Sequence, residues 1–362
     1  QLGSEAAVDG DTVLVSDGTY YENINFLGKN IIVKSVNGEA VTTIDGGGVT
    51  STVLINSGET DQAVLEGFTI TNGSGFHNVD GHHVGGGIAV RYASTPTLRN
   101  LIVEFNTAVE DTAMGGGIMC AYAADAIIED VIIRNNEADY GGGIVAYESS
   151  PSLERVKIYG NVARTTGGGV ALWTSETQIE QVAIYDNEAP YVGGGVWVHE
   201  GGHPVLNQVT IANNKTTANS GTTGAGIALS NGGNLTLQSS IVWGNTNRGI
   251  LANNIEFWSD GPPNGITILY SDVQGGEAGI VTNDNGTISW AANNIVDDPM
   301  FVDSNVGDYN LQTGSPCIGT GMLGVDMGAG AECMTLATDP LQALLPQQFE
   351  LYQNYPNPFN PS

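Results

Sequence analysis

Four residues in the middle of the chain have the side-chain types that acid–base catalysis uses. Glu137 and Glu188 each follow a recurring asparagine directly, and Asp139 and Arg164 lie near them in the sequence. If successive repeats stack about 4.8 Å apart, glutamates two repeats apart lie about 10 Å from each other. That is at the edge of the roughly 6.5–9.5 Å between the carboxyl groups of inverting glycosidases. In a chain with 39 acids such pairs also arise by chance, so a solvated acidic surface is the alternative.

Two groups of residues could bind metal ions. Stacked carboxylates suit Ca²⁺, which prefers oxygen ligands, although the calcium-binding repeat G-G-x-G-x-D is absent. His77, Asp80, His82 and His83 crowd one short segment and could bind a transition metal, whereas a solvated loop is the alternative. We therefore expect that no cofactor is required and that calcium is the ion to test.

Aromatic side chains recur at equivalent places after glycine-rich segments. Tyr147, Trp173, Trp197 and His199 alternate with apolar residues in segments that read as strands, so we expect them on the outward face of adjacent repeats. Exposed aromatic rings on a flat sheet suit stacking on sugar rings. The alternative is lateral packing against a loop or the C-terminal tail.

The elements that would position these residues are set by an internal repeat. Glycine triplets occur at 85–87, 115–117, 141–143, 167–169 and 193–195, followed by the variant Gly-Ala-Gly at 224–226. Their starts are 26 to 31 residues apart, and each triplet leads into a segment of alternating apolar residues. Period-two alternation predicts strands, and glycine permits the sharp corners between them.

A second pattern, with spacing 0, 3, 5 and 8, recurs in the same register and ends on an asparagine. No 3.6-residue periodicity accompanies it, which argues against helical solenoids and against a leucine-rich horseshoe. Stacked copies would bury a continuous core, and inward asparagine amides would bond up and down one column. We predict an all-β fold, a right-handed parallel β-helix of about ten turns with three short strands per turn. The expected asparagine ladder is Asn106, Asn136, Asn161, Asn187, Asn214 and Asn245.

The two ends of the repeat region resemble a known family. Residues 9–15 (DGDTVLV) with 18–20 (GTY) resemble the opening of bacterial pectin-lyase-like β-helix proteins, and the motifs within 298–329 resemble their closing segment. The resemblance implies a β-helix over residues 1–335, with a short N-terminal cap at 1–12, the most regular turns at 64–250 and less regular closing turns at 251–335. This family includes lyases, hydrolases and adhesins, and the catalytic strings of polygalacturonases are missing here.

The last fourteen residues, 349–362 (FELYQNYPNPFNPS), follow a linker at 336–348 and resemble the start of the C-terminal sorting domain of type IX secretion substrates. The resemblance implies export to the outside or the outer surface of a Gram-negative, Bacteroidota-like bacterium. Asp111-Thr112-Ala113 resembles the O-glycosylation motif of the same bacteria, which makes Thr112 a candidate acceptor. An accidental proline-rich linker is the alternative interpretation of the tail.

The three cysteines give a weaker indication of compartment. Cys120 occupies an inward strand position and is expected in the core. Cys317 and Cys333 flank a glycine-rich loop and could form a disulfide in an oxidising compartment.

Composition excludes several functions. With 39 acidic and 10 basic residues among 362, the net charge is −29, which argues against nucleic acid and anionic lipid as partners. No run of 18 apolar residues occurs, so membrane insertion is not expected.

These observations favour a non-catalytic extracellular or cell-surface protein: a scaffold, an adhesin that contacts glycans, or a self-associating fibre subunit. Open β-helix ends pair with other chains unless they are capped, so self-association end to end or through the C-terminal tail is expected, with extracellular polysaccharide as a further partner. The alternative is a polysaccharide lyase or glycoside hydrolase. Such a lyase needs a base and cations, and only ten Lys and Arg are present.

Overall fold

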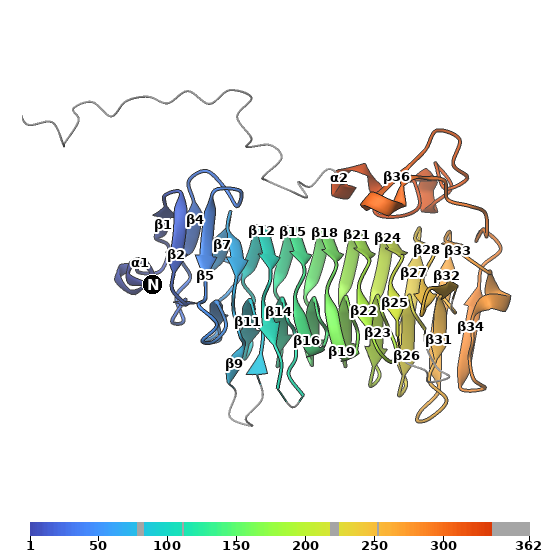
Figure 1. The fold of residues 1–362 in the computed structure, drawn as a ribbon, viewed down its shortest axis with the longest axis horizontal. Coiled ribbons are helices and arrows are strands. Elements are labelled where there is room, and N and C mark those ends of the chain that lie inside the picture. The colour runs from blue at the N-terminus through green and yellow to red at the C-terminus, as the bar shows by residue number, and fades with distance from the viewer. Residues whose placement is uncertain (78–82, 111, 218–223, 252, 335–362) are drawn as a thin grey trace, which may run out of the picture.

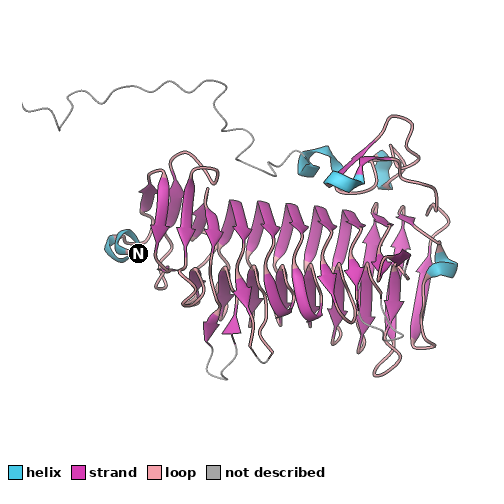
Figure 2. Cartoon of the chain, viewed as in Figure 1, coloured by secondary structure: helices cyan, strands magenta, loops and turns pink. Residues whose placement is uncertain are grey.

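The computed structural model describes residues 1–77, 83–110, 112–217, 224–251 and 253–334. Its body is a rod made of one coiled chain, with strands stacked turn on turn along its length (Figure 1). Figure 2 shows that helix is confined to the two ends and the segment above the rod. No helix among the described residues is both long and apolar enough to cross a membrane.

Three sheets run along the rod, and their strands pair in parallel except for the last pair of the third sheet. The nine strands of the second sheet mark nine turns, close to the ten expected. The first sheet contains β1 (Thr12–Val15), β4 (Ile32–Ser35), β7 (Val64–Glu66), β12 (Thr97–Glu104), β15 (Ile127–Arg134), β18 (Ser152–Tyr159), β21 (Gln178–Tyr185), β24 (Val205–Ala212), β27 (Asn234–Gln238), β32 (Asn264–Leu269) and β34 (Gly286–Trp290), joined by β2 (Gly18–Tyr21), β5 (Thr42–Asp45), β8 (Thr69–Thr71), β28 (Ile241–Trp243) and β33 (Asp272–Val273).

The other two sheets complete each turn. The second sheet contains β3 (Ile24–Asn25), β6 (Val53–Ile55), β11 (Ile88–Arg91), β14 (Ile118–Ala121), β17 (Ile144–Tyr147), β20 (Val170–Trp173), β23 (Val196–His199), β26 (Ile227–Ser230) and β31 (Ile255–Phe257). The third contains β13 (Thr107–Ala108), β16 (Glu137–Tyr140), β19 (Val162–Thr166), β22 (Glu188–Ala189), β25 (Lys215–Thr216), β29 (Thr246–Asn247) and β30 (Ile250–Leu251).

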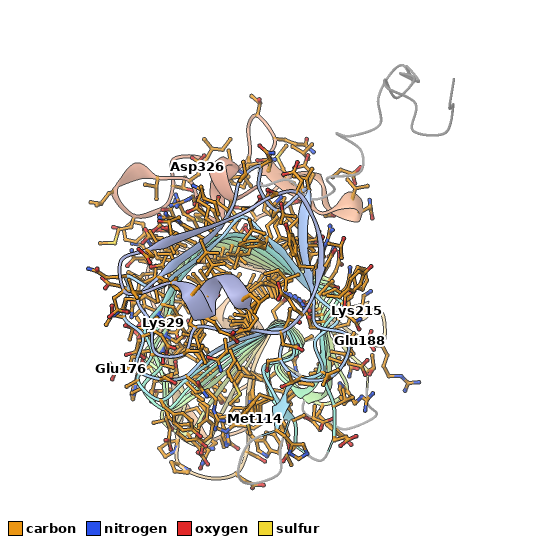
Figure 3. All side chains as sticks on the ribbon, turned by 90° about the vertical axis from the view of Figure 1, so that its left-hand side faces the viewer. Lys29, Met114, Glu176, Glu188, Lys215 and Asp326 are labelled. Atoms are coloured by element: carbon orange, nitrogen blue, oxygen red, sulfur yellow. The ribbon has the colours of Figure 1, made fainter. Side chains whose placement is uncertain are left out.

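Short elements flank these sheets. Helix α1 (Leu2–Ala6) lies across the N-terminal end of the coil, as the end-on view in Figure 3 shows, and Lys29 Nζ donates to the carbonyls of Ser4, Glu5 and Ala7, each at 2.8 Å. The expected short cap therefore contains one helical turn. The remaining elements are the hairpins β9 (Phe76–His77) with β10 (His83–Val84) and β35 (Phe301–Asp303) with β36 (Asp308–Leu311), the 3-10 turns at Glu277–Gly279, Ser304–Val306 and Met322–Gly324, and helix α2 (Gly330–Met334).

The spacing 0, 3, 5 and 8 has a backbone cause. In the turn of β15, Asp130 and Asn135 both have φ of 55°, the left-handed region that Asp and Asn tolerate best. Each such residue bends the strand. Inward-facing side chains on either side of it are then three residues apart instead of the usual two. Ile128, Val131 and Ile133 therefore all point into the core, and each is fully buried.

The glycine triplets form the corner between the third and second sheets, and their three positions differ. The first glycine has positive φ, for example +70° at Gly167. The next two pack against the neighbouring turn: a Cβ on Gly168 would lie 2.5 Å from the carbonyl oxygen of Gly194, and one on Gly169 would lie 2.7 Å from that of Gly195. The corners thus require glycine for close stacking as well as for the bend.

The recurring asparagines form a single hydrogen-bonded file inside the coil. Asn136 Nδ2 donates to Asn161 Oδ1 at 3.0 Å, and Asn161 Nδ2 donates to Asn187 Oδ1 at 3.0 Å. The same amide-to-amide bond links Asn106 to Asn136, Asn187 to Asn214, Asn214 to Asn245 and, at 2.8 Å, Asn245 to Asn254. The file therefore continues one residue beyond the six expected, because Asn254 enters it from an irregular turn.

Residues 298–334, which we call the C-terminal strap, depart from the expected closing turns. The coil continues through β34, and the strap then folds back along the outside of the first sheet (Figure 1). Helix α2 contacts β18 and β21. Tyr309 and Cys333 are buried there against Tyr185 and Ala183. The motifs within 298–329 thus close the fold by covering a sheet face.

The expected disulfide between Cys317 and Cys333 is wrong, because all three cysteines are free. Both cysteines belong to the strap, and their thiols are buried between it and the coil in separate apolar clusters. Cys317 Sγ donates to Asp272 Oδ2 at 3.3 Å, and Cys333 Sγ donates to the carbonyl oxygen of Val156 at 3.5 Å. Cys120 lies in the main core, as expected.

Asp272 makes the stability of the coil depend on pH. Its side chain is fully buried, and Oδ1 has no hydrogen-bond partner among the described residues. Burial, with Asp297 and Asp298 nearby, raises the pKa of Asp272 to about 7, against the opposing Cys317 hydrogen bond. An unfolded aspartate titrates near pH 4, so between about pH 4 and 7 the folded state retains a proton that the unfolded chain loses. The free energy of unfolding should therefore fall as the pH rises through that window.

Asp272→Asn should remove this dependence and raise the free energy of unfolding at pH 8 by about 2–4 kcal/mol. Urea unfolding at pH 4, 6 and 8 measures it, with exposed Asp61→Asn as the matched control. A variant whose stability falls with pH as steeply as the parent's would contradict this role for Asp272.

Candidate functional site

The outer face of the second sheet has an aromatic layer. Trp173 on β20 and Trp197 on β23 meet edge to face at 4.5 Å between ring centroids, and His199 lies 4.7 Å from Trp197. Tyr140 crosses this face from the third sheet, 5.4 Å from Trp173 and 6.2 Å from Trp197. The result is an outer apolar cluster separate from the core of the coil.

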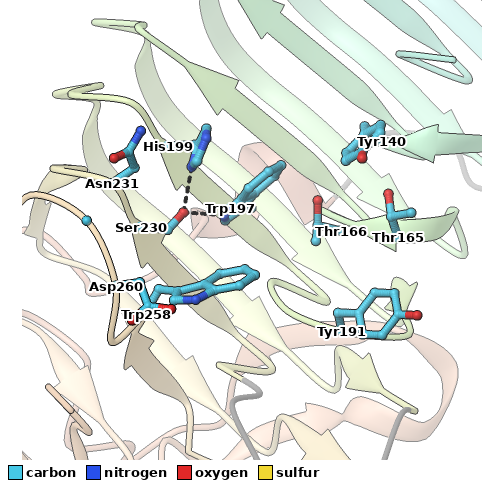
Figure 4. A pocket seen from close by; sticks show the side chains of 11 residues that line it. Tyr140, Thr165, Thr166, Tyr191, Trp197, His199, Ser230, Asn231, Trp258 and Asp260 are labelled. Atoms are coloured by element: carbon cyan, nitrogen blue, oxygen red, sulfur yellow. Dashed lines mark hydrogen bonds between the residues drawn. The ribbon is translucent and has the colours of Figure 1, made fainter. Parts of the chain in front are cut away.

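A pocket of about 570 Å³ opens at the C-terminal edge of this layer. Four aromatic rings contribute to its wall, together with hydroxyl, amide, imidazole and carboxylate groups (Figure 4). The volume is within the range of about 300–1,000 Å³ usual for small-ligand sites. The lining residues are Tyr140, Thr165, Thr166, Tyr191, Trp197, His199, Ser230, Asn231, Trp258, Asp260 and Gly261.

Hydrogen bonds fix one wall of the pocket. Trp197 Nε1 donates to Ser230 Oγ at 2.8 Å, and His199 Nδ1 lies 2.8 Å from the same oxygen. The three residues come from adjacent strands β23 and β26, so their backbones are rigid. Burial lowers the pKa of His199 despite the opposing charge of Glu200. At neutral pH the imidazole is therefore uncharged.

A loop after β31 forms the floor. Trp258 N donates to the carbonyl of Leu229 at 2.7 Å, and Asn285 Nδ2 donates to the carbonyls of Trp258 at 2.9 Å and Asp260 at 3.3 Å. Gly261 has φ of +87°, and a Cβ there would lie 2.8 Å from the Asn231 side-chain oxygen. The loop thus holds Trp258 and Asp260 against the end of β26.

Sequence comparisons agree with this architecture. The chain matches the sequence profile of the right-handed β-helix region over residues 17–189 and again over residues 178–319. The chain belongs to the right-handed β-helix family. Among solved structures, pectate lyase Pel9A superposes with a TM-score of 0.53 at 12% identity, over 91% of this chain and 90% of that chain. At that identity the likeness concerns the fold alone. No curated protein sequence matches this chain significantly.

This member of the β-helix family places the expected glycan-contacting residues in two environments. Trp197 and His199 line the pocket, whereas Tyr147 and Trp173 do not. The expected exposure of Trp173 is wrong: only 8% of its surface is accessible, because Tyr140 and Tyr147 pack against it. The expected exposure of Trp197 is wrong as well, because only 5% of its surface is accessible. For Trp173, lateral packing is thus the observed arrangement.

Among the lining residues, only Trp197 and His199 were site candidates from the sequence; those it missed include Tyr140, Tyr191, Trp258 and Asp260. Tyr140 directly precedes the glycine triplet at 141–143, and Tyr191 lies two residues before the triplet at 193–195. A search of the positions before each triplet would therefore have found both tyrosines. Trp258 and Asp260 follow an irregular turn and carry no repeat signal. Trp258 and Tyr191 are the accessible rings, 37% and 49% exposed.

The four expected catalytic residues lie outside the pocket lining. Arg164 Nε is 2.7 Å from Glu137 Oε1 in an ion pair, and Asp139 Oδ2 accepts a hydrogen bond from the Ala113 backbone at 3.0 Å. Val162 on the intervening turn is the backbone pairing partner of Glu137 on one side and of Glu188 on the other. The two glutamates therefore lie two turns apart, as expected. Glu137, Arg164 and Asp139 are thus engaged in bonds that stabilise the third sheet.

The remaining candidates concern metal and modification. His77 and His83 occupy facing positions on β9 and β10, while Asp80 and His82 lie outside the described residues. Within the described ranges, no cluster of three or more His, Cys, Asp or Glu side chains is arranged to hold a metal ion. Thr112 is exposed, with φ of 77°, and Asp111 lies outside the described residues.

Proposed function

We propose that this chain is a non-catalytic extracellular β-helix protein that binds a saccharide in the pocket between Tyr191 and Trp258. The observation that carries the proposal is the convergence of four aromatic rings with Thr, Ser and Asn side chains around one open space. Aromatic faces bury the C–H faces of sugar rings, and the hydroxyl and amide groups match sugar hydroxyls. A scaffold or adhesin that holds polysaccharide needs such a site.

Cleavage is the second candidate, because His199 and Asp260 both line the pocket. A neutral imidazole can accept a proton. Yet the described lining residues include one carboxylate where glycosidases use two. These residues also include no Lys or Arg to neutralise a uronate, as an elimination reaction requires. These features favour binding over turnover.

Trp258→Ala should weaken saccharide binding at least tenfold, since Trp258 offers the accessible indole face. Titration calorimetry with a panel of neutral, basic and acidic tetrasaccharides measures it. Tyr21→Ala, which removes an exposed ring at the other end of the rod, is the matched control and should bind like the parent.

The same incubations, followed by reducing-end and unsaturated-product assays with and without Ca²⁺, distinguish binding from cleavage. Turnover that is lost in His199→Ala would replace the binding proposal by the enzymatic one. If no tetrasaccharide binds, the proposal that the pocket is a saccharide site is overturned.

Location and assembly are further parts of the proposal. The tail at 349–362 supports export by type IX secretion and placement on a bacterial surface. Helix α1 covers the N-terminal end of the coil, so the proposed end-to-end self-association relies on exposed apolar side chains beside it, including Leu14 and Tyr21 at 65% and 79% exposure.

A further inference from the structure

We infer that the pocket selects a cationic sugar, one bearing a free protonated amine, over neutral and acidic sugars. This inference rests on the proposed function and names its ligand class.

The charged side chains that line the pocket favour a cationic ligand. Among the described residues that line the pocket, Asp260 is the one carboxylate, and Lys and Arg are absent. His199 adds no positive charge at neutral pH, because burial lowers its pKa. An anionic ligand would therefore meet a carboxylate with no compensating cation, whereas an ammonium group would form a charge-assisted hydrogen bond.

Nearby acids reinforce this field. Glu200 Oε1 lies 3.6 Å from His199 Nε2. Glu256, two residues before Trp258, is buried and accepts hydrogen bonds from Gly224 N and from the side chains of Asn253 and Asn283, each at 3.1 Å. With a net charge of −29 on the whole chain, the potential at the pocket is negative and attracts cations.

The aromatic wall favours the same charge. Ring faces carry negative quadrupole density and attract ammonium groups within about 6 Å. Trp197 gives its N–H to Ser230, so its only donor does not compete for the ligand. Figure 4 shows Asp260 beside Trp258 on one side of the pocket and Tyr191 across from them. A sugar stacked on Trp258 thus has a carboxylate within its reach.

Hydroxyl recognition separates an amino sugar from a simple amine. Asn231 lines the pocket and offers both a donor and an acceptor. Thr165, whose hydroxyl donates to the Asp139 carbonyl, offers an acceptor. A small quaternary ammonium ion would leave these groups unused.

The test compares four ligands by calorimetry on the whole chain at pH 7: the glucosamine tetramer, its fully N-acetylated form, cellotetraose and tetragalacturonate, with choline as a fifth probe. We expect the glucosamine tetramer to bind at least tenfold tighter than the others. Raising NaCl from 20 to 500 mM should weaken that binding several-fold through screening. Asp260→Asn should reduce glucosamine binding about tenfold, so that the preference for the glucosamine tetramer over the neutral tetramers is lost.

Asp61→Asn removes the same charge from a distant exposed site and should leave all affinities as in the parent. Equal binding of cellotetraose and glucosamine tetramer, or no effect of Asp260→Asn, overturns the charge selection but leaves saccharide binding standing. Choline binding as tightly as the tetramer overturns the sugar requirement. If no saccharide binds, the proposed function fails together with this inference.

Discussion

Asn161→Leu is expected to lower the free energy of unfolding by about 4 kcal/mol. The amide of Asn161 accepts from the Asn136 backbone N–H at 3.0 Å and donates to the Ile133 carbonyl at 2.9 Å, and both asparagines are buried. Leucine is of similar size, fills the space and leaves both backbone groups without a partner. Each buried unsatisfied group costs about 1–3 kcal/mol, and the file of amides on either side is interrupted. Guanidinium unfolding with linear extrapolation measures the loss.

Asn161→Asp sharpens this test, because it keeps the acceptor and loses the donor. A carboxylate there would face the Ile133 carbonyl and the Asn187 side-chain oxygen, so stability should fall further as the pH rises. Asn207→Ala, which removes an amide bonded only to side chains on the outer face, is the matched control. A loss below 1 kcal/mol for Asn161→Leu would show that the amide file contributes little.

Gly168→Ala should destabilise the coil by 3 kcal/mol or more, or prevent folding. The added methyl would lie 2.5 Å from the Gly194 carbonyl oxygen and 2.6 Å from that of Glu188, and both are backbone atoms fixed in the next turn. Overpacking costs about 1–3 kcal/mol even where side chains can move, so a contact with two rigid carbonyls should exceed that. The thermal unfolding midpoint and the soluble yield report the change.

Gly279→Ala provides the comparison, because the nearest atom to its Cβ would be 3.6 Å away. It should be neutral within about 0.5 kcal/mol. If Gly168→Ala were equally neutral, neighbouring turns would have to separate freely, and the glycine corners would matter only for their bend.

The sequence predicted the coil because every turn repeats the same local requirements. Three recurring features illustrate this: the glycine before Val170, the apolar spacing through Ile179 and the asparagine at 187. Each of them contacts the equivalent position of an adjacent turn. The strap was not predicted as a cover, because its contacts with β18 and β21 join residues more than 100 positions apart and obey no period.

The pocket was predicted in part for the same reason. Trp197 and His199 belong to the repeat and could be placed on the second sheet in advance. Their burial could not, since it depends on Tyr140 crossing from another sheet. Trp258 and Asp260 lie in an insertion held by bonds to Leu229 and from Asn285, which follow no repeat.

The strap also limits which faces of the coil remain uncovered. It lies along the first sheet (Figure 1), whereas the pocket is lined by residues of the second and third sheets and of the loop after β31. Ligand binding at the pocket and packing of the strap therefore use different faces of the same coil.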